Sequence, residues 1–143
     1  MTADMLHAVE IQADPGTVYR AITTTEGEAG FWTKDNDTPP EVGSVARFGF
    51  PEAPVDVRMR IEKLEPDSIV EWACEGDFPG WGGTSVSWEL EPKDGATQLM
   101  FRHGGWPTKY SDAEWASVNF VWGQIVGRLK AYAESGKPQP FFP

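Results

Sequence analysis

Two runs of alternating apolar and polar residues lie close together in the second half of the chain, at residues 84–90 and 97–103. A period of two is typical of a strand that turns one face to a core and the other to water. The residues of the inward parity are Val86, Trp88, Leu90, Leu99, Phe101 and His103. Between the runs, Asp94-Gly95 favours a tight turn, because this pair readily adopts positive φ. The pattern predicts a β-hairpin.

After residue 107 the spacing of the large apolar residues changes from two to three or four. From Trp115 onward they are Val118, Trp122, Ile125, Val126, Leu129 and Tyr132. This spacing predicts a long helix with one apolar stripe, and Gly136 is typical of a helix end. Gly127 lies inside the helix, where glycine costs about 1 kcal/mol relative to alanine. We expect it to allow a close approach of the helix to a sheet.

The first part of the chain predicts a strand followed by two short helices. Val9 and Ile11 alternate with polar neighbours, which indicates the strand. Asp14 can cap a helix whose first residue is Pro15, since the missing N–H of proline costs nothing at that position. Residues 23–30 predict a second, weaker helix or turn.

A polar, proline-bearing connection is expected at 35–43, and strands follow it at 44–50, 55–64 and 69–74. In the clearest of these strands, the inward residues are expected to be Val55, Val57, Met59 and Ile61. Antiparallel strands that run into one long C-terminal helix predict an α+β fold, in which the helix lies across a curved sheet. At 143 residues the chain has the size of a single domain, 1–143. A helix laid on a sheet in this way can leave a cavity between the two layers.

Charge and composition exclude several classes of partner. The formal net charge of −10 argues against binding to nucleic acid or to an anionic membrane surface. No apolar run reaches the 18 residues of a membrane span, and Met1–Met5 lacks the basic start of a signal peptide. The single cysteine, Cys74, excludes an intramolecular disulfide and fits a reducing compartment. We therefore expect a cytoplasmic protein.

The order of short motifs along the chain resembles that of a known superfamily. The motifs are I-x-A-x-P-x-x-V-Y-x-A-I-T from Ile11, then Phe31-Trp32-Thr33, Glu65-Pro66, Trp81-Gly82-Gly83-Thr84, and finally Thr97, Leu99, Phe101, His103, Gly105, Trp106, Trp122, Leu129, Tyr132, Gly136 and Pro140. Together they resemble the START-like helix-grip (SRPBCC) superfamily. The most similar branch is that of the C-terminal domain of the heat-shock-protein-90 ATPase activator, often labelled polyketide-cyclase-like. The resemblance implies about seven antiparallel strands wrapped around a long C-terminal helix, two short helices after the first strand, and an internal cavity for small apolar molecules. It implies no particular reaction.

Aromatic residues are frequent, with seven tryptophans and eight phenylalanines. Their rings both fill cores and line small-molecule pockets. Trp32, Trp81, Trp106 and Trp115 lie at the ends of predicted elements or between them, where the mouth of a cavity would be. The predicted ligand-binding residues are Trp32, Phe48, Phe50, Met59, Trp72, Trp81, Phe101, His103, Trp106, Trp115 and Trp122. The alternative for each of them is ordinary core packing.

His103 is the candidate site residue with the most versatile chemistry. It could orient a ligand carbonyl or act as a general base, since imidazole titrates near neutrality. The alternative is a neutral structural histidine, whose pKa burial lowers. Cys74 is expected to be a small buried hydrophobe and not a nucleophile. The acidic residues expected to form a solvated edge near the mouth are Glu26, Glu28, Asp35 and Asp37.

The sequence leaves three functions open. The first is binding of a small hydrophobic or aromatic molecule in an internal cavity between the sheet and the C-terminal helix. The second is a cyclase- or dehydratase-type enzyme with His103 as general base, and the third is a chaperone-associated interaction module. No cofactor is expected, and no metal, because His7 and His103 lack ligand partners at suitable spacing. Nucleic acid and membrane are not expected as partners, and a homodimer is left open.

Overall fold

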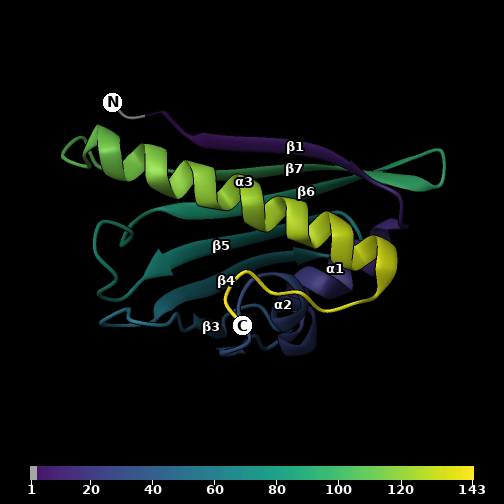
Figure 1. Cartoon of the computed structure of the whole chain (residues 1–143), viewed down its shortest axis with the longest axis horizontal. Helices are drawn as coiled ribbons and strands as arrows, with labels where there is room; N and C mark the ends of the chain where they lie inside the picture. Colours follow the sequence, from purple (N-terminus) through teal and green to yellow (C-terminus); the bar gives the residue numbers. More distant parts are fainter. Residues whose placement is uncertain (1–2) are drawn as a thin grey trace.

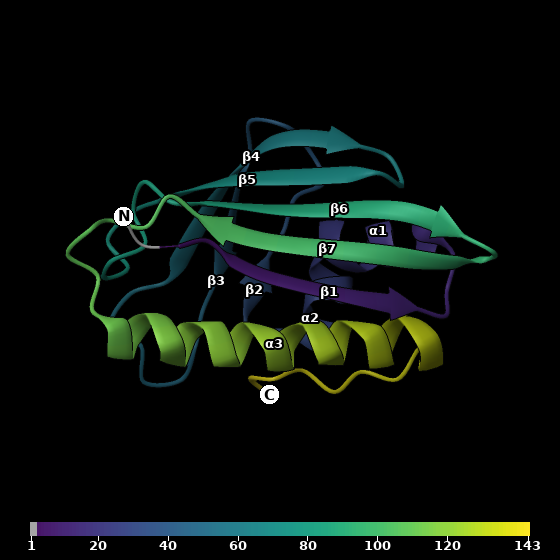
Figure 2. The same ribbon diagram turned by 90° about the horizontal axis from the view of Figure 1, so that it is seen from above.

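Seven antiparallel strands form one curved sheet, and a long helix lies diagonally across its face (Figures 1 and 2). This computed structural model describes residues 3–143; Met1 and Thr2, which belong to the predicted domain span, lie outside the described residues. The strand order is β1-β7-β6-β5-β4-β3-β2. The strands are β1 (Met5–Ile11), β2 (Asn36–Asp37), β3 (Val45–Phe48), β4 (Val57–Glu65), β5 (Ile69–Glu75), β6 (Ser85–Lys93) and β7 (Ala96–Gly104). The predicted α+β helix-grip fold is confirmed.

The hairpin predicted from the two alternating runs is formed by β6 and β7. Trp88 pairs with Phe101 at its centre. Asp94 and Gly95 have φ angles of 50° and 83°, the conformation that a two-residue turn between twisted strands requires. The side chains of the predicted inward parity are all buried: Val86, Trp88, Leu90, Leu99, Phe101 and His103.

Strand β4 follows its predicted pattern with one exception. Val57, Met59 and Ile61 are buried on the inner face. The prediction that Val55 joins them is wrong, since its side chain is 37% exposed. β4 begins only at Val57, so Val55 lies in the preceding connection and follows no strand alternation. The prediction of a plain connection at 35–43 is also incomplete, because its residues 36–37 pair with β3 as the short strand β2.

Helix α3 (Asp112–Ser135) covers the sheet. It begins before Trp115, because the Ser111 hydroxyl accepts a hydrogen bond from the backbone N–H of Glu114 at 3.1 Å and so caps the first turn. It ends at Gly136, whose φ of 74° is the left-handed conformation of a helix cap. The buried side chains of its apolar stripe are Trp122, Ile125, Val126 and Leu129.

The expectation that Gly127 allows the helix to approach the sheet is wrong. Gly127 is exposed, and a Cβ atom built on it meets no atom within 4 Å. Gly123, one turn earlier, makes the close approach, since a Cβ there would lie 3.2 Å from Cε1 of His7 in β1. The two glycines lie on the same side of α3, but the helix crosses the sheet diagonally, so only the earlier one lies against β1.

Helices α1 (Pro15–Thr23) and α2 (Thr25–Phe31) lie beside the C-terminal half of α3 at one end of the sheet (Figure 1). Asp14 caps α1 as predicted, accepting a hydrogen bond from the backbone N–H of Thr17. Thr24 caps α2 in the same way, accepting from Gly27 at 3.0 Å. In the part of the chain that is described, no helix is long and apolar enough to cross a membrane.

The last seven residues, 137–143, form a C-terminal strap that runs back along α2 (Figure 1). The backbone N–H groups of Gln139, Phe141 and Phe142 donate to the carbonyl oxygens of residues 30–32. Arg128 of α3 donates to the carbonyl oxygen of Gln139 at 2.9 Å. The strap therefore holds Phe142 beside the end of α2.

Candidate ligand-binding cavity

An apolar cavity of about 360 Å³ lies between the N-terminal half of α3 and the connections that follow β3 and β5. Its volume is within the range of small-molecule sites, which are mostly apolar with a few polar groups. The lining residues are Trp32, Phe50, Pro51, Glu52, Ala53, Phe78, Trp81, Ser117, Val118, Val121, Trp122, Ile125 and Phe142. Glu52 is the only ionisable side chain among them.

Six aromatic rings reach this lining from five separate segments. They are Trp32 at the end of α2, Phe50 after β3, Phe78 and Trp81 after β5, Trp122 in α3, and Phe142 in the C-terminal strap. The centroid of the Trp122 ring lies 4.9 Å from that of Trp32 and 6.1 Å from that of Trp81. Rings at these spacings pack favourably on one another and give a stiff apolar wall.

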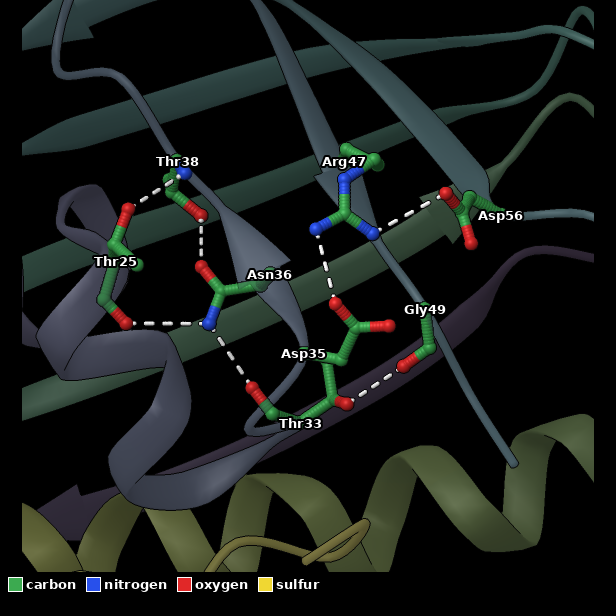
Figure 3. Close-up of polar contacts among 8 residues, drawn as sticks. All are labelled: Thr25, Thr33, Asp35, Asn36, Thr38, Arg47, Gly49 and Asp56. Carbon is green, nitrogen blue, oxygen red and sulfur yellow. Dashed lines mark hydrogen bonds and ion pairs between the residues drawn. The ribbon is translucent and has the colours of Figure 1, made fainter.

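A polar network fixes the chain that follows Trp32 (Figure 3). The side-chain amide of Asn36 donates to the carbonyl oxygens of Thr25 and Thr33 at 3.2 and 3.0 Å. Its own oxygen accepts a hydrogen bond from the hydroxyl of Thr38 at 2.7 Å. Asn36 is thereby satisfied although it is almost fully buried, and it ties α2 to β2.

The same segment is tied to the chain that leads to Phe50 (Figure 3). The backbone N–H of Gly49 donates to the carbonyl oxygen of Asp35 at 2.8 Å. The Arg47 guanidinium lies between the carboxylates of Asp35 and Asp56, at 2.9 and 3.2 Å. These ion pairs are partly exposed and add little stability. Their effect is to fix the course of the chain, and with it the position of a lining ring.

A second apolar groove of about 310 Å³ adjoins the cavity and shares five of its lining residues. It adds Pro54, Pro79, Tyr110 and Glu114. Burial raises the pKa of Tyr110 above its usual value of 10. The indole N–H of Trp81 is buried, and it has no partner at hydrogen-bonding geometry.

His103 lies behind the cavity wall and has both ring nitrogens engaged. Its Nδ1 accepts a hydrogen bond from the indole N–H of Trp122 at 3.1 Å. The hydroxyl of Thr84 donates its one proton to the carbonyl oxygen of Trp81 at 2.6 Å. The Thr84 oxygen therefore accepts the hydrogen bond that joins it to Nε2 of His103 at 2.9 Å. This arrangement assigns the proton to Nε2. Burial lowers the pKa of His103 to about 3, so the imidazole is neutral at physiological pH.

The structure places four of the eleven predicted ligand-binding residues on the cavity: Trp32, Phe50, Trp81 and Trp122. Seven lie outside its lining, namely Phe48, Met59, Trp72, Phe101, His103, Trp106 and Trp115. Five of these, Phe48, Met59, Trp72, Phe101 and His103, belong to the inner face of the sheet and are buried. Trp106 stacks on Tyr110, with ring centroids 4.6 Å apart. Trp115 donates its N–H to the carbonyl oxygen of Ala3 and so packs towards the chain that leads into β1.

Two of the lining rings were not predictable from the alternation of residues. Phe78 lies in the glycine-rich connection after β5, where no strand or helix period indicates its direction. Phe142 is brought to the cavity by the backbone hydrogen bonds of the C-terminal strap. The sequence signal for both is the same: a large aromatic residue in a short segment that is otherwise rich in glycine or proline.

The acidic residues expected at a solvated edge do not all lie there. Glu26, Asp35 and Asp37 are exposed, as predicted. For Glu28 the prediction is wrong, because its side chain is 0% exposed and neither carboxyl oxygen has a hydrogen-bond partner. Burial raises the pKa of Glu28 well above its usual value of 4.5. α2 turns this residue inward because it lies one helical turn from Phe31 and Trp32, which also face the core.

Cys74 has the properties of a core residue. It is 4% exposed, and burial raises the pKa of its thiol to about 11. A thiol with so high a pKa is a poor nucleophile near neutral pH. Among residues 3–143, no three side chains of histidine, cysteine, aspartate or glutamate come together in a way that could hold a metal ion.

The curved sheet, the long C-terminal helix and the two short helices after β1 define a protein of the α+β helix-grip class. A family model described as Activator of Hsp90 ATPase homolog 1-like protein matches residues 12–134, and the chain belongs to this family. The resemblance stated from the sequence is thereby confirmed. A search of curated proteins found no match.

Solved structures of similar proteins share the fold of this chain. The Aha1 dimer from Colwellia psychrerythraea is 31% identical, with a TM-score of 0.84 over 95% of this chain and 99% of that one. DynU16, from the dynemicin biosynthetic locus, is 24% identical, with a TM-score of 0.80; the match covers 99% of this chain and 51% of DynU16. SSP2350 from Staphylococcus saprophyticus is 18% identical over 96% of each chain, with a TM-score of 0.78. The last two similarities concern the fold alone.

Proposed function

We propose that this protein binds a small hydrophobic or aromatic molecule in the cavity between α3 and the connections that follow β3 and β5. The site expected from the sequence, between α3 and the inner face of the sheet, is filled by core side chains. The observation that carries the proposal is the convergence of six aromatic rings from five segments on one apolar space of about 360 Å³. Removing apolar ligand surface from water supplies the driving force, at about 25 cal/mol per Å². The Ser117 hydroxyl and the Glu52 carboxylate are the polar side chains of the lining, available to orient a ligand.

In this proposal His103 acts through its neighbours and does not touch the ligand. It holds the indole of Trp122 directly, and through Thr84 it is connected to the carbonyl oxygen of Trp81. Both tryptophans line the cavity. A stiff wall loses little conformational entropy when a ligand binds, and this favours affinity.

The enzymatic alternative is less well supported by the geometry. A general base must reach the substrate proton with a free lone pair, and its pKa must lie near the working pH. The Nδ1 lone pair of His103 already accepts a hydrogen bond, its pKa is about 3, and it is not part of the cavity lining. The chaperone-associated alternative rests on the family's name. A cytoplasmic location, where a free thiol such as Cys74 stays reduced, belongs to the proposal as well.

The neutral fluorescent probe N-phenyl-1-naphthylamine tests the proposed function. It should bind saturably, close to one molecule per chain, and quench tryptophan emission. Val121→Phe, which places a ring in the lining, should weaken this binding at least about fivefold because it fills the space. Gln124→Phe is the matched control on an exposed position of the same helix and should leave binding unchanged. Linear, non-saturating uptake, or equal binding by both variants, would argue against the cavity as the site.

We also propose that the chain forms a homodimer. The 31% identical relative from Colwellia psychrerythraea has a dimeric solution structure, and Phe120 on α3 is 67% exposed. Aromatic residues are enriched at protein interfaces. Sedimentation equilibrium should therefore give the mass of a dimer, and Phe120→Ser should shift the protein towards monomer more than Gln124→Ser does. A monomer at all concentrations would contradict this proposal and leave the proposal on ligand binding untouched.

A further inference from the structure

The lining of the cavity combines six aromatic rings with one carboxylate and no basic side chain. We propose that it prefers a cationic apolar ligand, such as an aryl or alkyl quaternary ammonium ion, over a neutral or an anionic one. The inference rests on the proposed function, because it names the class of ligand for the same cavity. Two features of the lining support it: the aromatic rings themselves and the charges at the opening.

The rings provide the first argument. The face of an aromatic ring carries partial negative charge, so a cation within about 6 Å of the centroid is attracted, most strongly by tryptophan. Trp32, Trp81 and Trp122 all contribute to the lining, and three phenylalanine rings complete it. Several rings around one space are the arrangement with which proteins hold quaternary ammonium groups. An anion in the same space would be repelled by the partial negative charge of the ring faces.

The charges provide the second argument. The only ionisable side chain in the cavity lining is Glu52, which is exposed at the opening. The adjoining groove adds one more acid, Glu114, and neither lining contains a lysine, an arginine or a histidine. A buried anion without a cationic partner or hydrogen bonds is strongly disfavoured.

The wider surroundings do not reverse this preference. Lys34 lines a groove that shares Phe50, Pro51 and Phe142 with the cavity, and Asp35 lines it as well. Arg58 lines another groove together with Asp56 and Asp77. Arg47 is paired with Asp35 and Asp56. The three bases of this region are nevertheless outnumbered by five acids, namely Asp35, Glu52, Asp56, Asp77 and Glu114, and the whole chain carries a net charge of −10. The potential at the opening favours the approach of a cation.

Three probes of one shape and different charge test the inference: phenyltrimethylammonium, neutral tert-butylbenzene and benzenesulfonate. Each joins a phenyl ring to a tetrahedral head group. Titrations followed by tryptophan fluorescence, and by the indole N–H resonances in NMR spectra, should rank them with the ammonium ion tightest and the sulfonate weakest. A cation–π contribution at a partly open site corresponds to roughly a three- to fivefold gain of the ammonium ion over its neutral isostere.

Variants separate the charge of the opening from the shape of the cavity. Glu52→Gln should weaken binding of the ammonium ion by about two- to threefold and leave tert-butylbenzene unchanged, because an exposed charge contributes modestly. Glu62→Gln, on the exposed face of β4, is the matched control and should change neither affinity. Adding salt should reduce the effect of Glu52→Gln, since it screens exposed charges.

The outcomes distinguish this inference from the proposed function. Equal affinity for the three probes, or tightest binding of the sulfonate, overturns the charge preference and leaves the cavity as a binding site. Failure of the ammonium ion to bind to a protein that binds the neutral naphthylamine also overturns the charge preference. Failure of every probe, including the naphthylamine, overturns both proposals.

Discussion

His103 in β7 and Glu28 in α2 are both fully shielded from solvent, yet only the histidine is hydrogen-bonded. The partners of His103 are Thr84, just before β6, and Trp122 in α3, and each engages a different ring nitrogen. Around Glu28 no donor reaches either oxygen. Burial lowers the pKa of the histidine and raises that of the carboxyl group, so in both cases it favours the neutral form. Burial thus shifts the pKa of both groups towards the neutral form, whereas hydrogen-bond partners decide whether a buried polar group costs stability.

The largest expected effect is that of removing the histidine. His103→Leu leaves the indole N–H of Trp122 buried without an acceptor, and we expect the free energy of unfolding to fall by about 2–4 kcal/mol. Urea denaturation followed by tryptophan fluorescence measures it.

A double-mutant cycle checks the cause. Trp122→Phe removes the donor, so in the His103→Leu background it should cost at least about 1 kcal/mol less than it does in the wild type. Strictly additive effects would show that the hydrogen bond does not couple the two side chains, and the comparison with Glu28 would then lose its basis.

Replacing Glu28 should change the free energy of unfolding in the opposite direction. Glu28→Leu replaces an unpartnered carboxyl group by an apolar side chain of similar size, and we expect the free energy of unfolding to rise by about 1–3 kcal/mol at pH 7. Glu26→Leu on the exposed side of α2 is the control, and it should change stability by less than about 0.5 kcal/mol. Destabilisation by Glu28→Leu would mean that the carboxyl group has a partner in solution, such as an ordered water molecule.

The pH dependence of stability should differ in sign between the two sites. The folded pKa of Glu28 is raised, so its contribution to stability is full below the unfolded pKa of about 4.5 and is lost as pH rises towards the folded value. The folded pKa of His103 is about 3, so its contribution is full above the unfolded pKa of about 6.5 and is lost as pH falls between the two values. Each slope reaches at most about 1.4 kcal/mol per pH unit.

Denaturation curves of wild type and variants between pH 4 and pH 8 measure these slopes. Glu28→Gln, which does not titrate, should remove the loss of stability at rising pH. His103→Leu should remove the loss at falling pH. Parallel profiles for the wild type and either variant would show that the corresponding group keeps its ordinary pKa in the folded protein.

The smallest expected effect concerns two glycines of α3, one with a close neighbour and one without. Gly127→Ala should stabilise the protein by about 0.5–1 kcal/mol, since alanine favours the helix and the added Cβ meets no atom. Gly123→Ala should stabilise it less, or destabilise it, because its Cβ would lie 3.2 Å from the His7 ring. Differential scanning calorimetry of both variants measures the difference. Equal effects would contradict the close approach of Gly123 to His7 and with it the packing of α3 on β1.

The local patterns of the sequence determined most of the fold. Alternation defined β4, β6 and β7, the spacing of three and four defined α3, and Asp14, Asp94-Gly95 and Gly136 marked where elements begin, turn or end. These signals depend on the period of a strand or helix and on the conformations that single residues prefer. They extend over only a few residues, and for this reason a sequence contains them directly.

Only the tertiary structure decided which inward residues surround an empty space and which pack on one another. Phe48 and Phe50 are two residues apart, yet the first is core and the second lines the cavity. Phe142 reaches the cavity through the C-terminal strap, and Glu28 is buried because of what α2 packs against. Periodicity indicates which side of a helix or strand is apolar. What packs against that side comes from segments distant in the chain, and whether these segments fill the space or leave a cavity or an unpartnered polar group is not determined by any local pattern.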